Sequence, residues 1–172
     1  MATLLAPANC HADLAGSTVL LESFFPNLTR LEESWGPESV VDPGVEFPVV
    51  FQDGGRPDGE IVWSSDVFPS QIHLNHLASN NDLGGADFNG FVYTFSDLNG
   101  TISDVTLNAA STLTPTQYWH NTNQVFVDVE GIGIIGSGIS TILDVTVVPE
   151  PSGMTALLLG FAVLLGGRSR KS

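Results

Sequence analysis

Histidine, cysteine, serine and paired acidic residues are the side chains in this sequence that could do chemistry. His73 and His76 are three residues apart, so on a strand their rings would point to opposite faces and could not hold one metal ion together. The single cysteine, Cys10, has no partner for a disulfide. No Gly-x-Ser-x-Gly motif marks a nucleophilic serine, and pairs such as Asp128 with Glu130 arise by chance among 19 acidic residues. We therefore expect no catalytic residue, no metal site, no cofactor and no enzyme.

Two oxygen-rich loops leave calcium binding open as an alternative. They contain Asp97, Asn99, Thr101 and Asp104 in one case and Asn80, Asn81, Asp82 and Asp87 in the other. Calcium takes six to eight oxygen ligands, but neither loop has the twelve-residue EF-hand pattern with its final glutamate. A turn in which Asp or Asn side chains bond the local backbone explains both loops more simply.

An aromatic patch leaves carbohydrate binding open in the same way. It consists of Tyr118, Trp119 and His120, and two further tryptophans are Trp35 and Trp63. Exposed aromatic rings on a β scaffold can bind sugars, but large aromatic residues more often fill the core. The sequence favours core positions for these rings.

The charge of the chain excludes nucleic acid as a partner. The net charge is -14, with 19 acidic and five basic residues, and three of the basic residues lie within the segment 168–172 at the end of the chain. Binding to phosphate requires lysine and arginine, so the rest of the chain should repel nucleic acid and anionic lipid. A solvated acidic surface is the simplest reading.

Alternation of apolar and polar residues predicts strands through most of the chain. The rows expected to face inward are Val45, Phe47, Val49 and Phe51; Phe91, Tyr93 and Phe95; Val125, Val127 and Val129; and Ile139, Thr141, Leu143, Val145 and Val147. Thr18 to Phe25 forms a further apolar run, and Pro48 indicates an edge strand or a bulge. Asn99-Gly100, between Phe91–Ser96 and Thr101–Leu107, predicts a hairpin. Seven or eight short strands predict an all-β, antiparallel β-sandwich or jelly roll for residues 13–147.

The N-terminal residues 1–12 are similar to the second half of a secretory signal. A short apolar run is followed by Pro7 and by small residues at Cys10 and Ala12, before a polar start at Asp13. The basic region that opens such signals is missing, so we expect the true start to lie upstream, unless this segment is not a signal. Asp13 is then the expected first residue of the mature chain.

The C-terminal residues 148–172 contain three zones in order. Pro149, Glu150 and Pro151 form a stiff, extended segment. Residues 154–167 are free of charge and, as a helix, would span about 22 Å, less than the ~30 Å of a hydrocarbon core. A basic end with Arg168, Arg170 and Lys171 should stop transfer and stay in the cytoplasm. These zones predict one short transmembrane helix, with the body on the far side of the inner membrane.

The three zones at the chain end resemble the PEP-CTERM sorting signal of exported bacterial proteins. This resemblance implies a partner, an exosortase-like membrane enzyme that recognises Pro149, Glu150 and Pro151 and removes the tail. It also implies a destination at the cell surface or in an extracellular matrix with exopolysaccharide. We expect an exported protein with a structural or adhesive body, anchored in the inner membrane during transit. A carbohydrate- or calcium-binding module on the same scaffold is the alternative.

Overall fold

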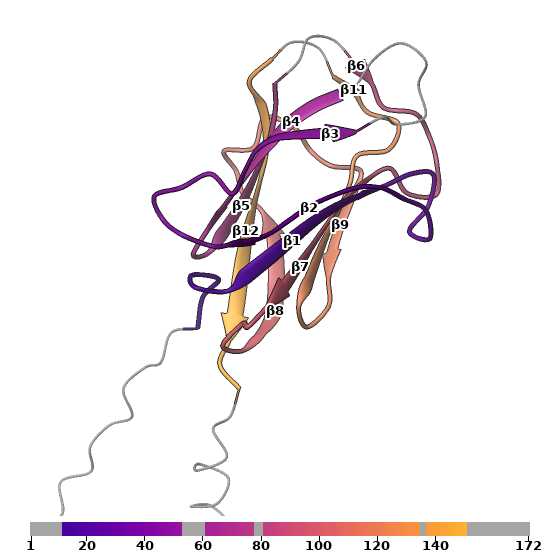
Figure 1. Cartoon of the computed structure of the whole chain (residues 1–172). Coiled ribbons are helices and arrows are strands. Elements are labelled where there is room, and N and C mark those ends of the chain that lie inside the picture. The colour runs from indigo at the N-terminus through magenta and orange to yellow at the C-terminus, as the bar shows by residue number, and fades with distance from the viewer. Residues whose placement is uncertain (1–11, 53–60, 78–80, 135–136, 151–172) are drawn as a thin grey trace, which may run out of the picture.

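The structure is a computed structural model that describes residues 12–52, 61–77, 81–134 and 137–150. Within these ranges the chain forms twelve β-strands and no helix (Figure 1). The first six strands are β1 (Thr18–Phe24), β2 (Leu31–Ser39), β3 (Phe47–Gln52), β4 (Ile61–Phe68), β5 (Gln71–His76) and β6 (Asn81–Asp82). The other six are β7 (Gly90–Ser96), β8 (Thr101–Leu107), β9 (Gln117–His120), β10 (Gln124–Asp128), β11 (Gly133–Ile134) and β12 (Ile139–Val148).

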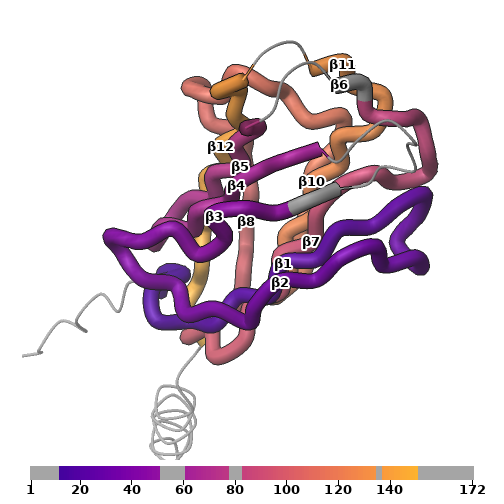
Figure 2. Tube along the Cα trace, turned by 45° about the horizontal axis from the view of Figure 1, so that its top comes forward, coloured from indigo at the N-terminus to yellow at the C-terminus, as the bar shows by residue number. Residues whose placement is uncertain are grey.

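Ten of these strands form two antiparallel sheets that pack face to face (Figures 1 and 2). The order in the first sheet is β2-β1-β7-β10-β9, and the order in the second is β3-β4-β5-β12-β8. Strands β6 and β11 make a small separate pair. The predicted all-β fold of two antiparallel sheets is therefore confirmed. The expected C-terminal helix lies outside the described residues.

The core lies between the two sheets, where the predicted alternation puts it. Phe91, Tyr93 and Phe95 of β7 are buried, and so are Val125 and Val127 of β10. In β12 the inward row from Thr141 to Val147 is buried as well, while the residues between them are exposed or half-buried. Period-two burial of this kind is the physical reason these segments form strands.

A hydrogen bond between side chains joins the two sheets through the core. The hydroxyl groups of Ser65 in β4 and Tyr93 in β7 lie 2.8 Å apart, and both residues are buried. Burial raises the pKa of Tyr93, so the phenol keeps its proton for this bond. Beside it, the ring of Trp63 packs against His76 and Phe91 with centroids 5.1 and 5.5 Å apart. This packing fixes how the two sheets face each other.

The expected common face of Val45, Phe47, Val49 and Phe51 is wrong. Phe47 is buried, whereas Val45 and Val49 are 53% and 47% exposed. The register between β3 and β4 shifts between Phe47 and Val50, and Val50 takes the next buried position. This bulge surrounds Pro48 on an edge strand, as the proline predicts, because proline has no N–H group for a ladder bond.

The expected hairpin at Asn99-Gly100 is also wrong. Strand β7 lies in one sheet and β8 in the other, so this connection crosses between the sheets. Gly100 serves a different purpose here: a side chain on it would overlap the carbonyl oxygen of Val148 at the end of β12. The glycine allows close approach of two backbones, and Asp97 adopts a positive φ of 57° before it.

Candidate functional site

The last described residues place the start of the Pro149-Glu150-Pro151 segment at the surface of the body. Strand β12 ends at Val148, which is exposed and pairs with Thr101 of β8. Pro149 is half-buried and Glu150 is exposed. Pro151 and the basic residues Arg168, Arg170 and Lys171 lie outside the described residues. The carboxylate of Glu150 therefore projects two residues beyond the sheet.

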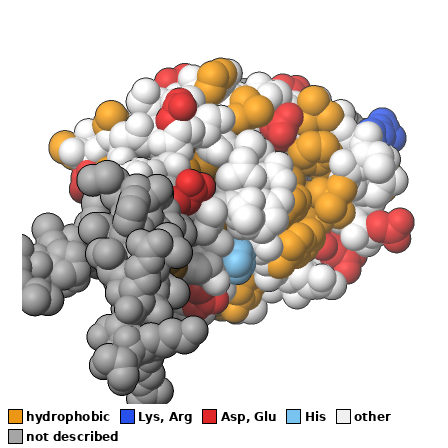
Figure 3. Space-filling view, turned by 90° about the horizontal axis from the view of Figure 1, so that it is seen from below, with side chains coloured by type: hydrophobic (Ala, Val, Ile, Leu, Met, Phe, Trp, Pro, Cys, Tyr) orange, Lys and Arg blue, Asp and Glu red, His pale blue; other side chains and the backbone are white. Residues whose placement is uncertain are grey.

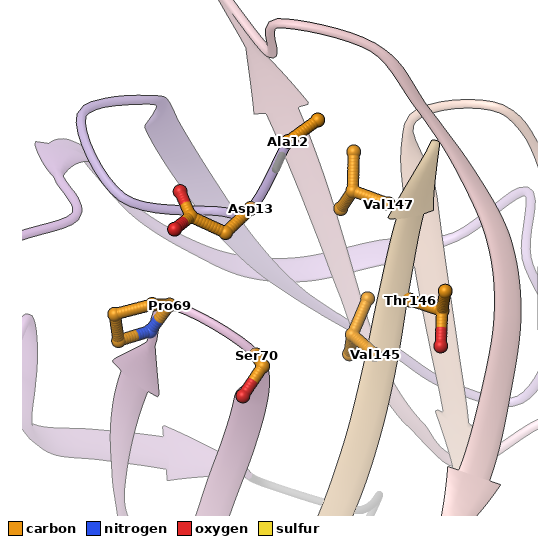
Figure 4. A pocket seen from close by; sticks show the side chains of 7 residues that line it. All are labelled: Ala12, Asp13, Pro69, Ser70, Val145, Thr146 and Val147. Atoms are coloured by element: carbon orange, nitrogen blue, oxygen red, sulfur yellow. The ribbon is translucent and has the colours of Figure 1, made fainter. Parts of the chain in front are cut away.

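The first described residues lie beside the end of β12. Ala12 and Asp13 line a cavity of about 170 Å³ together with Val147 and neighbouring residues (Figure 4). Ala12 is buried, and the backbone N–H of Leu14 donates to the carbonyl of Pro69 at 2.8 Å. The segment that enters the body and the segment that leaves it thus meet at one end of the fold. The expected mature start at Asp13 would leave Ala12 outside the chain, although its side chain packs here.

A pair of acidic side chains lies between β4 and the loop before β3. Glu46 accepts hydrogen bonds from the backbone N–H groups of Val41 and Val67 at 3.0 and 2.8 Å. Asp66 lies next to Glu46, and its Oδ1 is buried without a hydrogen-bond partner. Burial, the Glu46 carboxylate and the charge of Asp42 raise the pKa of Asp66 to about 6.

We expect Asp66→Asn to stabilise the protein at pH 7 and to have little effect at pH 4. The Asp66 carboxyl group binds a proton more tightly in the native state than in the unfolded state. The wild type therefore loses stability as the pH rises from about 4 to about 6. The asparagine cannot ionise and can donate to Glu46. After a discount for partial solvent exposure, the expected gain at pH 7 is ~1 kcal/mol, or ~3 °C in Tm. Thermal unfolding at several pH values measures it, with the exposed Asp87→Asn as the control.

The exposed face of the second sheet has a connected row of polar side chains. His73 donates from Nε2 to the amide oxygen of Gln71 at 3.0 Å, and Gln71 donates to Asp144 at 2.7 Å. Asn108 donates to both carboxylate oxygens of Asp144 at 3.0 and 2.9 Å. Burial lowers the pKa of His73, against the smaller opposing effect of Asp144. These bonds join β5, β12 and the end of β8.

The two histidines occupy opposite faces of β5, as their spacing predicts. His73 is half-buried on the outer face beside the Phe68 ring, at 4.6 Å between centroids, and His76 is buried in the core against Trp63. In the part of the chain that is described, no three His, Cys, Asp or Glu residues gather where they could hold a metal ion. Asp87 is exposed in the second oxygen-rich loop, and Asn80 lies outside the described ranges.

The three tryptophans have different environments. Trp63 is fully buried and Trp35 packs against the core, as the sequence favoured. Trp119 does not belong to the core: it lies on the outer face of the first sheet and is 36% exposed. Its indole stacks on Phe126 with 4.9 Å between centroids and 3° between planes. The ring of Phe88 meets it edge-on at 5.7 Å.

Loop contacts hold Phe88 in this cluster. The buried carboxylate of Asp128 accepts hydrogen bonds from the N–H groups of Asn89 and Glu130, each at 3.1 Å. Burial raises the pKa of Asp128, and these two bonds oppose the rise. Glu130 accepts a bond from the N–H of Ala86 at 3.1 Å. The loop before β7 is thereby tied to the end of β10, and it carries Phe88 to the outer face.

Seen from below, the molecule shows hydrophobic side chains gathered in a band, with acidic side chains around it (Figure 3).

Among the described residues, no helix has the length and hydrophobicity needed to cross a membrane. Comparison with known proteins found no match, whether to a family model, a curated protein or a solved structure.

Proposed function

We propose that this chain is an exported protein whose C-terminal tail is a sorting signal for an exosortase-like membrane enzyme. The observation that carries the proposal is the order of three zones at the chain end: Pro149-Glu150-Pro151, an uncharged apolar run, and Arg168, Arg170 and Lys171. The apolar run is the short transmembrane helix of the precursor. The basic end stays in the cytoplasm by the positive-inside rule, and the body lies on the opposite side of the inner membrane.

The position of the motif relative to the body supports this proposal. A processing enzyme must reach an extended segment, and the exposed Glu150 lies only two residues beyond the end of β12. Ala12 and Val147 line the same cavity, so a leader and a tail would leave the body by the same end. The rest of the two sheets then projects away from the membrane.

The body in this proposal is a structural or adhesive module at the cell surface or in a matrix with exopolysaccharide. Its exposed edge strand β2 carries Glu32, Glu33, Glu38 and Pro37. Charges and proline on an edge strand prevent uncontrolled pairing with other sheets. A module displayed outside the cell would benefit from such protection.

Intact-mass analysis of the protein released by cells that contain an exosortase tests the proposal. We expect a mature form that ends near Pro149–Pro151 and begins near Ala12 or Asp13, and a membrane-bound precursor that keeps the basic end. Released protein that still ends at Ser172 would contradict the proposal.

A further inference from the structure

The Trp119 cluster is a rigid, partly open aromatic surface on the first sheet. Trp119, Phe126 and Val92 are direct cross-strand neighbours on β9, β10 and β7. Val92 and Phe88 are buried on this face, so the exposed ring rests on a packed base. The stacking on Phe126 fixes the plane of the indole, and a fixed ring loses little conformational entropy when a ligand binds.

Two glutamines lie near the ring, and hydrogen bonds hold one of them, Gln124, in place. Gln124 lies on the same face of β10 as Phe126; it donates to Thr94 at 2.9 Å and accepts from Asn121 at 2.7 Å. Gln117 lies two residues before Trp119 on β9, on the same face, and is exposed. Amide groups of this kind can both donate to and accept from hydroxyl groups.

The small exposed area favours a small flat ligand ring over a protein partner. Trp119 is the large hydrophobic side chain left exposed at this edge of the sheet, and the exposed Leu31 lies at the opposite edge, on β2. A stable protein interface buries about 800 Å² on each side, far more than one indole offers. One sugar ring, by contrast, covers about one indole face, and the exposed amide of Gln117 lies beside that ring on the same strand.

The charge around the cluster selects among polysaccharides. Arg30 is the one lysine or arginine within the described residues, and the whole chain has a net charge of -14. Glu22 continues the same row of neighbours on β1, next to Val92. An anionic polymer would meet repulsion here without a compensating basic residue, whereas an uncharged one would not.

We propose that the Trp119 face binds an uncharged polysaccharide, with one sugar ring stacked on the indole and its hydroxyl groups bonded to Gln117 on the same edge strand. This inference deepens the adhesive role proposed for the body and rests on it for the source of the ligand. Trp119 supplies most of the affinity, because aromatic residues in fixed positions dominate small interfaces.

Affinity electrophoresis of the full chain in a neutral detergent tests the proposal. The probes are hydroxyethylcellulose and dextran, which are uncharged, and carboxymethylcellulose, which has the cellulose backbone with added negative charge. We expect retardation by at least one uncharged polymer and none by the charged one. Trp119→Ala and Trp119→Gln should each weaken binding about tenfold or more, while Trp119→Phe keeps a stacking ring and should bind within about threefold.

Val45→Ala, an exposed apolar residue elsewhere on the body, is the control and should bind as the wild type does. The ligand should also change the tryptophan fluorescence of the wild type but not of Trp119→Phe, whose remaining tryptophans lie away from this face. Three results would each overturn the inference. The first is that Trp119→Ala binds as tightly as the wild type, and the second is that neither uncharged polymer retards the wild type. The third is that the wild type forms a dimer and Trp119→Ala is a monomer. Processing of the tail is measured separately, so a failure here leaves the sorting proposal intact.

Discussion

Gly90→Ala is expected to lower the free energy of unfolding by ~3 kcal/mol or more. A Cβ atom at Gly90 would overlap the carbonyl oxygen of Val127 and lie 3.0 Å from the Cα of Asp128. Both atoms belong to the backbone of the neighbouring strand, so no side chain can move aside. The ladder between β7 and β10 would have to open, at the centre of the first sheet.

Chemical or thermal unfolding measures this loss, which corresponds to a fall in Tm of about 10 °C. The matched control is Gly85→Ala, because a Cβ there meets Glu130 Oε2 at an ordinary 3.7 Å. Gly90→Ala should also disturb the Trp119 cluster, since Phe126 and Asp128 lie on the strand that it displaces. Equal stability of the two variants would show that β7 and β10 are not packed as described.

The sequence predicts the layers of this fold better than its connections. Alternation identifies β1, β7, β10 and β12 because each has one face in the core, and a period of two is the direct result. It does not identify β2 (Leu31–Ser39), which is mostly exposed and interrupted by Gly36-Pro37. An edge strand held mainly by backbone bonds has no hydrophobic pattern to reveal it.

Local turn chemistry fails where a distant contact decides the structure. Asn99-Gly100 has the composition of a hairpin turn, but its glycine is needed for the approach of Val148, which is 48 residues later in the chain. The sequence fails to predict the exposure of Trp119 for the same reason. The strand pattern does not reveal that Phe126 and Phe88 fill the positions beside the indole, which depends on the pairing of β9 with β10.

Glu150→Gln is expected to slow removal of the tail at least about tenfold, the equivalent of ~1.4 kcal/mol in the barrier. The substitution keeps the size of the side chain and removes its charge, which the proposed sorting enzyme would recognise. Pro149→Ala should act in the same direction, because the prolines on either side hold Glu150 extended. Full-length protein then accumulates in the membrane fraction, as immunoblots of fractionated cells would show.

The matched control is Glu38→Gln, the same change at an exposed position on β2. Because Pro149 and Glu150 follow the last strand, their variants should unfold at the same temperature as the wild type, which separates processing from folding. If both Glu150→Gln and Pro149→Ala were processed normally, the enzyme would not recognise these two residues. If the proposal is right, the wild type in an exosortase-deficient host should behave as Glu150→Gln does, because in both cases the apolar run would stay attached and would keep the body at the membrane.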